Sequence, residues 1–81
     1  MGREEEAQLR QQAEAKIDGA EETFKRIDQK TLAKDQQEFV STIQSFLSKA
    51  REALSVKDFS RAYNLADKAL ILAEELVGAV R

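Results

Sequence analysis

The chain has 81 residues, enough for one small domain and too few for two independent hydrophobic cores. It contains no Pro, Cys, His or Trp, and its formal net charge is -2. Without Cys it cannot form a disulfide or use a thiolate as ligand or nucleophile, and without His it lacks the usual general base and zinc ligand. The composition therefore argues against an enzyme, and we predict no catalytic residue, no cofactor and no metal site.

The distribution of charge and of apolar residues also bears on the partners. Acidic and basic residues are mixed along the chain, whereas a nucleic-acid binder usually carries a basic patch, so we expect no nucleic-acid partner. The longest uninterrupted apolar run extends only from Ala69 to Ala73, while a helix that crosses a bilayer needs roughly 20 apolar residues. We therefore predict no membrane insertion by this segment.

The first periodic segment covers residues 3–27. Its apolar residues recur at steps of three and four, which predicts a helix with a narrow apolar seam; they are Leu9, Ala13, Ile17, Ala20, Phe24 and Ile27. Glu21 and Lys25 are spaced to form an i,i+4 ion pair. Gly19 marks either a weak point or a close approach of another backbone, or it is a surface glycine that the helix tolerates, and we favour the last interpretation. Residues 1–8 precede the seam and are expected to be a frayed end or an addition to the domain.

The second segment covers residues 34–56 and is predicted to be a helix with one clearly buried face. Its apolar residues are Phe39, Val40, Ile43, Phe46, Leu47, Ala50, Ala53 and Leu54. The residues from Asp28 to Ala33 leave room for a turn between the first two helices. We expect Leu32, within that turn, to close one end of the core.

The third segment, residues 59–79, follows Asp58, whose carboxylate suits the N-cap position of a helix. Its apolar residues spread over about half of the helical circumference, which predicts neighbours on two sides. Short connections favour antiparallel neighbours. The predicted fold is all-α: a single domain over residues 1–81, in which a helical hairpin (34–56 and 59–79) is closed by a longer N-terminal helix (3–27).

The hairpin resembles a single tetratricopeptide repeat. An Asp-aromatic start at Asp58 and Phe59 is followed by small residues at Ala62 and Ala69, where the helices of that family cross. Only one repeat fits, and a solenoid needs about three. We interpret this resemblance as shared helix packing.

A broader resemblance covers residues 24–77. The pattern is similar to that of small helical domains at the C-terminal end of bacterial envelope proteins and predicted lipoproteins, with Lys57 where the turn often has Gly. The matching residues are Leu32, Asp35, Gln36, Gln37, Ile43, Phe46, Ala50, Ala53, Asp58, Arg61, Ala62, Leu65, Ala66, Lys68, Ala69, Leu72 and Leu76. The resemblance implies an exported, non-enzymatic domain; a cytoplasmic location stays open.

Three apolar residues of the third segment are candidates for binding a partner. Ile71 falls on the polar side of this helix, at 100° per residue, and is either an ordinary exposed residue or part of an interaction surface. Leu65 and Leu72 extend the apolar stripe on one edge and would be exposed if the first helix leaves that edge uncovered.

These features predict a non-catalytic helical module that binds a protein partner or has a structural role, as the tail domain of a longer bacterial envelope protein. The alternative is a self-assembly domain, in which residues 3–27 pair with a second copy as a coiled coil or a swapped helix.

Overall fold

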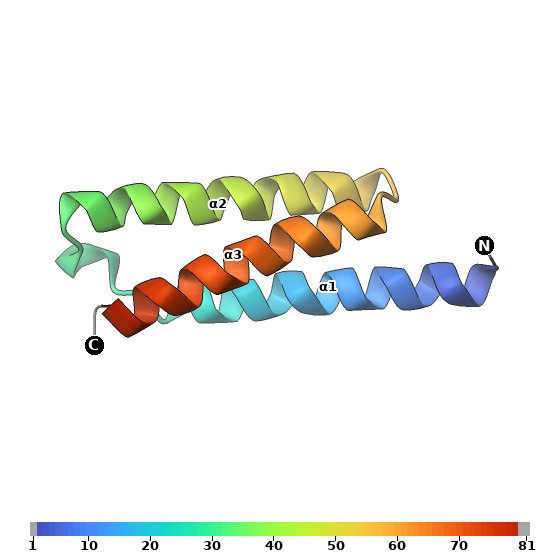
Figure 1. Cartoon of the computed structure of the whole chain (residues 1–81), viewed down its shortest axis with the longest axis horizontal. Coiled ribbons are helices and arrows are strands. Elements are labelled where there is room, and N and C mark those ends of the chain that lie inside the picture. Colours follow the sequence, from blue (N-terminus) through green and yellow to red (C-terminus); the bar gives the residue numbers. More distant parts are fainter. Residues whose placement is uncertain (1, 80–81) are drawn as a thin grey trace.

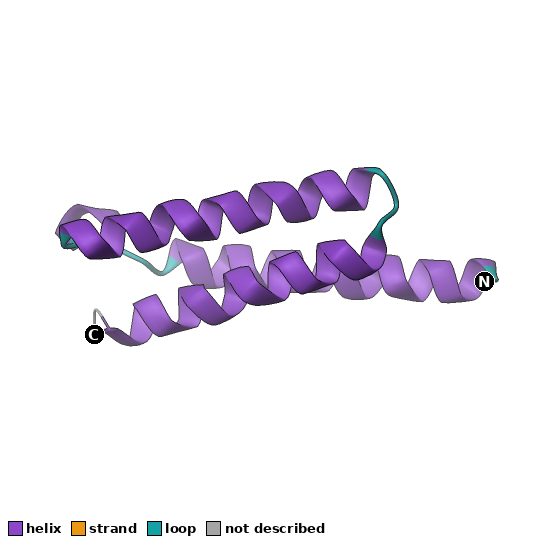
Figure 2. Cartoon of the chain, turned by 45° about the horizontal axis from the view of Figure 1, so that its top comes forward, coloured by secondary structure: helices purple, strands orange, loops and turns teal. Residues whose placement is uncertain are grey.

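A computed structural model of the chain describes residues 2–79 and has three long helices and one short 3-10 helix. Helix α1 spans Arg3–Lys25, η1 spans Gln29–Thr31, α2 spans Lys34–Ser55 and α3 spans Phe59–Ala79. Consecutive long helices run in opposite directions (Figure 1), and the part of the chain outside them is limited to short connections (Figure 2). The predicted all-α, antiparallel three-helix bundle is confirmed.

Helix α3 is the centre of this bundle. It packs along both α1 and α2, whereas α1 and α2 contact each other much less, and Figure 1 shows α3 running obliquely between the other two. The broad apolar circumference of α3 accounts for this position, because only a helix with apolar residues on two sides can bury itself against two neighbours.

The core is built from aliphatic side chains and alanines. Ile43 in α2 is completely buried and is the largest side chain with almost no solvent contact. The buried positions of α3 are mostly small, so the backbone of α3 can approach its neighbours closely; they are Phe59, Ala62, Ala66, Ala69, Ala73 and Leu76.

The connection between α1 and α2 differs slightly from the sequence prediction. Helix α1 ends at Lys25 rather than at residue 27, yet Ile27 is still buried and belongs to the main core cluster. The carboxylate of Asp28 accepts a hydrogen bond from the backbone N–H of Lys30 at 3.0 Å and starts the 3-10 turn. Leu32 is buried in the main core cluster, as predicted.

The connection between α2 and α3 is a tight Schellman turn. The N–H of Lys57 donates to the carbonyl of Leu54 at 3.0 Å, and the N–H of Asp58 donates to the carbonyl of Ala53 at 2.9 Å. Lys57 has a φ of 64°, the left-handed conformation that this motif requires. Asp58 then caps α3 as predicted, because its carboxylate accepts from the N–H of Arg61 at 3.3 Å.

The first turns of α1 extend past the α2–α3 connection without a neighbouring helix (Figure 1). Residues 3–8, at the predicted frayed end, are helical and exposed. Residues 1, 80 and 81 of the predicted domain lie outside the described part of the chain.

Candidate functional site

The structure separates the three candidate residues by exposure. Leu65 and Leu72 are half-buried and pack against the main core cluster, so they line the edge of the core. Ile71 is 48% exposed, in agreement with its predicted position on the outer side of α3. Because consecutive helical residues differ by 100°, Ile71 lies beside the row that contains Leu65 and Leu72 rather than within it.

Leu65 and Leu72 belong to a row of residues with alternating steps of four and three along α3. A spacing that averages 3.5 residues keeps side chains on one side of a helix. This α3 row consists of Arg61, Leu65, Lys68, Leu72, Glu75 and Ala79.

Helix α2 carries a second row with the same spacing. It consists of Asp35, Phe39, Thr42, Phe46, Lys49, Ala53 and Val56. Phe46 is half-buried, whereas Phe39 is 37% exposed and Val56 is 71% exposed. Apolar side chains therefore alternate with charged ones along the α3 row, and with charged or polar ones along the α2 row as far as Ala53.

Two shallow hollows place these rows on the same side of the hairpin. Beside the turn, a hollow of about 250 Å³ is lined by Lys49, Ala53, Val56 and Arg61, together with Glu52 and Asp58. At the opposite end, a hollow of about 270 Å³ is lined by Asp35, Phe39, Glu75 and Ala79, with Gln36 and Leu76. Each hollow joins members of both rows. We call the side of the hairpin formed by the two rows the α2–α3 face, and Ile71 lies at its margin, on the outer side of α3.

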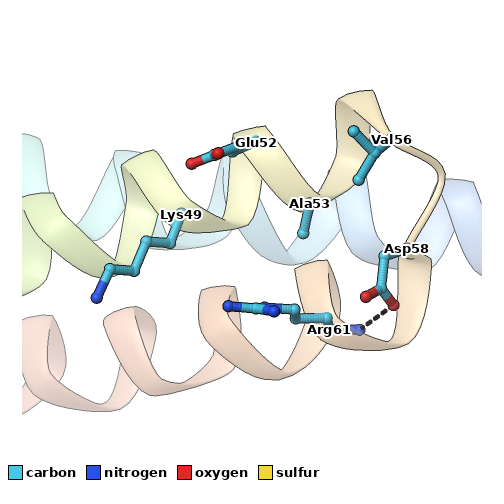
Figure 3. Close-up of a pocket in the computed structure, with 6 residues that line it drawn as sticks. All are labelled: Lys49, Glu52, Ala53, Val56, Asp58 and Arg61. Atoms are coloured by element: carbon cyan, nitrogen blue, oxygen red, sulfur yellow. Dashed lines mark hydrogen bonds between the residues drawn. The ribbon is translucent and has the colours of Figure 1, made fainter.

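The basic side chains near the turn point into the space between the two helices. Figure 3 shows Lys49 reaching from α2 and Arg61 from α3 into this space, while Glu52 runs along α2. Asp58 is occupied by its capping hydrogen bond to the backbone of Arg61. The positive charges of Lys49 and Arg61 therefore lie at the surface of the hollow beside the turn.

The ion pairs of the described residues lie elsewhere. Lys16 of α1 contacts the Asp67 carboxylate at 3.3 Å and lies over the ring of Tyr63 at 5.1 Å. The hydrogen bond to Asp67 raises the pKa of Lys16, because it favours the charged ammonium. Arg51 pairs with Glu21 at 2.8 Å across α1 and α2.

The pairing of Glu21 with Arg51 also replaces the expected pair of Glu21 with Lys25. Lys25 instead contacts Glu22 at 3.3 Å, one residue closer along α1. Sequence spacing could not reveal Arg51 as a partner, since it comes from a helix that lies nearby only in the folded chain. Within residues 2–79, no ion pair involves the charged residues of the two rows.

Sequence reasoning assigned Phe39 and Phe46 to the buried stripe and did not place them on a surface. The sequence signal that could have indicated a surface position is the 3.5-residue spacing of the α2 row, which follows the margin of the buried stripe.

In the described part of the chain, no group of three or more Asp and Glu residues is arranged to hold a metal ion. None of the helices described combines the length and the hydropathy that a bilayer crossing requires.

Comparison of the chain with models of known protein families, with curated proteins and with solved structures found no match. The chemistry of the α2–α3 face is therefore the main guide to function.

Proposed function

We propose that this chain is a non-catalytic protein-interaction module that binds a partner through the α2–α3 face. The observation that carries this proposal is the exposure of Ile71 and Phe39 beside the half-buried side chains of Phe46, Leu65 and Leu72. Single exposed apolar residues are ordinary, but several on one side of a helical hairpin form the kind of patch that a partner covers.

The chemistry of the face suits binding rather than catalysis. Its charged groups are exposed Lys, Arg, Asp and Glu side chains, and its hollows are shallow and open. General acid–base and nucleophilic catalysis usually take place in a concave pocket that encloses the substrate. Apolar residues flanked by charges are instead typical of interaction surfaces, where the charges select the partner and its orientation.

The resemblance to envelope proteins suggests a setting for this function, as the tail domain of a longer exported protein. The alternative role as a self-assembly domain based on residues 3–27 receives less support. The seam of α1 is used within the chain, since Ala13, Ile17 and Ala20 are buried against the other helices. A coiled coil through the same seam would have to displace α3.

A photo-crosslinking amino acid placed at individual positions in the native host tests the proposed surface. At position 71 we expect adducts of higher mass, because this side chain is 48% exposed at the margin of the face. The matched control is position 74, which is also exposed and on the same helix but outside both rows. Equal adduct formation at both positions, or none at position 71, would contradict the proposal. Circular dichroism of the two proteins checks that both are folded.

A further inference from the structure

We propose that the partner of the α2–α3 face is a second copy of this chain, docked antiparallel about a two-fold axis near Ile71 and Leu72. This inference rests on the proposed function, because it names the occupant of the same face. It is based on the order of the charges and apolar residues along the two rows. When a second copy runs in the opposite direction, its acidic residues meet the basic residues of the first copy.

The charges of the α3 row are divided by position. Arg61 and Lys68 lie on the side toward the turn, and Glu75 lies on the other side. The α2 row repeats this order, since Lys49 is in its half nearer the turn and Asp35 lies in the far hollow with Glu75. Along the two rows, each copy therefore carries basic side chains in the half toward the turn and acidic side chains in the other half, whereas Glu52 and Asp58, which also line the turn hollow, lie outside the rows.

Lys68 and Glu75 are placed symmetrically about the point between Ile71 and Leu72. At a rise of 1.5 Å per residue, each lies about 5 Å from that point along the helix axis. A two-fold axis through the same point brings Lys68 of each copy opposite Glu75 of the other. Because the interface is isologous, this contact occurs twice.

The remaining residues of the rows fit the same register. Arg61 lies about 16 Å from the axis on the basic side, and Asp35 lies beyond Glu75 on the acidic side, where the hollow also includes Ala79. In the antiparallel dimer, the basic end of each copy therefore lies against the acidic end of the other. Leu72 of the α3 row lies at the level of the axis, and Ile71 lies at the same level at the margin of the face.

A parallel arrangement of two copies would be unfavourable. It would bring the basic half of one face against the basic half of the other, and like charges in contact cost several kcal/mol. A partner of a different kind needs its own matching charge order, whereas a second copy has this order already.

Sedimentation equilibrium of the full chain tests the proposal. We expect the wild type to dimerise, and Lys68→Glu or Glu75→Lys alone to weaken dimerisation at least about tenfold, because each creates two like-charge contacts. An equimolar mixture of the two variants is expected to restore dimers, since both contacts then join opposite charges. Glu74→Lys is the matched control and should leave the dimer unchanged, because residue 74 lies outside the rows.

Three results would overturn the second copy as the partner. These are a wild type that stays monomeric at about 1 mM, a dimer that Lys68→Glu does not weaken, and a mixture that does not recover. Failure of the proposed function is distinct from this, because it is read from crosslinking at position 71. A monomeric chain whose position 71 crosslinks to another protein would overturn the homodimer and leave the interaction surface in place.

Discussion

Lys57 shows how one residue sets the geometry of the hairpin. Its left-handed backbone, with φ of 64°, allows two consecutive N–H groups to return to the carbonyls of α2. Gly is the usual residue at this position of a Schellman turn. A side chain with a Cβ pays roughly 1–2 kcal/mol in the left-handed region, whereas Gly does not.

We therefore expect Lys57→Gly to stabilise the protein. The strain energy that Gly relieves in the folded state exceeds the entropic cost of the more flexible unfolded chain. The free energy of unfolding therefore rises by about 0.5–1 kcal/mol. This corresponds to a rise in Tm of roughly 2–8 °C for a domain of this size, measured by circular dichroism. Lys57→Ala keeps the Cβ and should change the Tm little. A lower Tm for Lys57→Gly would show that the Lys57 side chain makes a stabilising contact.

At the scale of the element, α1 combines a narrow apolar seam with a polar outer surface. Its buried residues follow the predicted spacing, and Gly19 lies within the helix. A Cβ built at Gly19 meets no heavy atom within 4 Å, other than its own helix backbone and chain neighbours. This confirms the interpretation of Gly19 as a surface glycine, with no close approach of another helix to explain it.

Gly19→Ala should accordingly raise the free energy of unfolding by about 1 kcal/mol, because Ala loses less backbone entropy than Gly in a helix and nothing obstructs its methyl group. Urea denaturation measures the change. Gly78→Ala is a comparison with an equally open site near the end of α3, where fraying should make the gain smaller. If Gly19→Ala were destabilising, α1 would have to approach another helix more closely at this point.

At the scale of the whole molecule, stability depends on a small number of large side chains among many alanines. The helices form an elongated bundle with extents of 47 × 18 × 14 Å, so few positions are far from solvent. Ile43 has no exposed surface, and it is the largest side chain buried to this degree. Its neighbours in the main cluster come from all three helices.

Ile43→Ala should therefore destabilise the whole bundle rather than one helix. Large-to-Ala substitutions in a core cost about 2–5 kcal/mol, and a domain of this length has a total stability of roughly 4–12 kcal/mol. We expect one cooperative urea transition at a much lower midpoint. Val56→Ala removes an apolar side chain that is 71% exposed and should shift the midpoint little. A loss of helicity limited to part of the chain would contradict this single core.

The helices and most of their limits were predictable from the sequence, because apolar spacing, the absence of Pro and the Asp58 cap act locally. Tertiary structure decided how far apart α1 and α2 lie, which carboxylate Arg51 meets, and how much of Phe39, Leu65 and Leu72 stays accessible. The physical reason is that periodicity gives the angle of a residue around its own helix axis, whereas exposure depends on where the other axes lie. The sequence of 81 residues, which lacks Cys and His, thus predicted a helical bundle without obvious catalytic groups. The structure added the α2–α3 face, on which charged and half-buried apolar side chains come together.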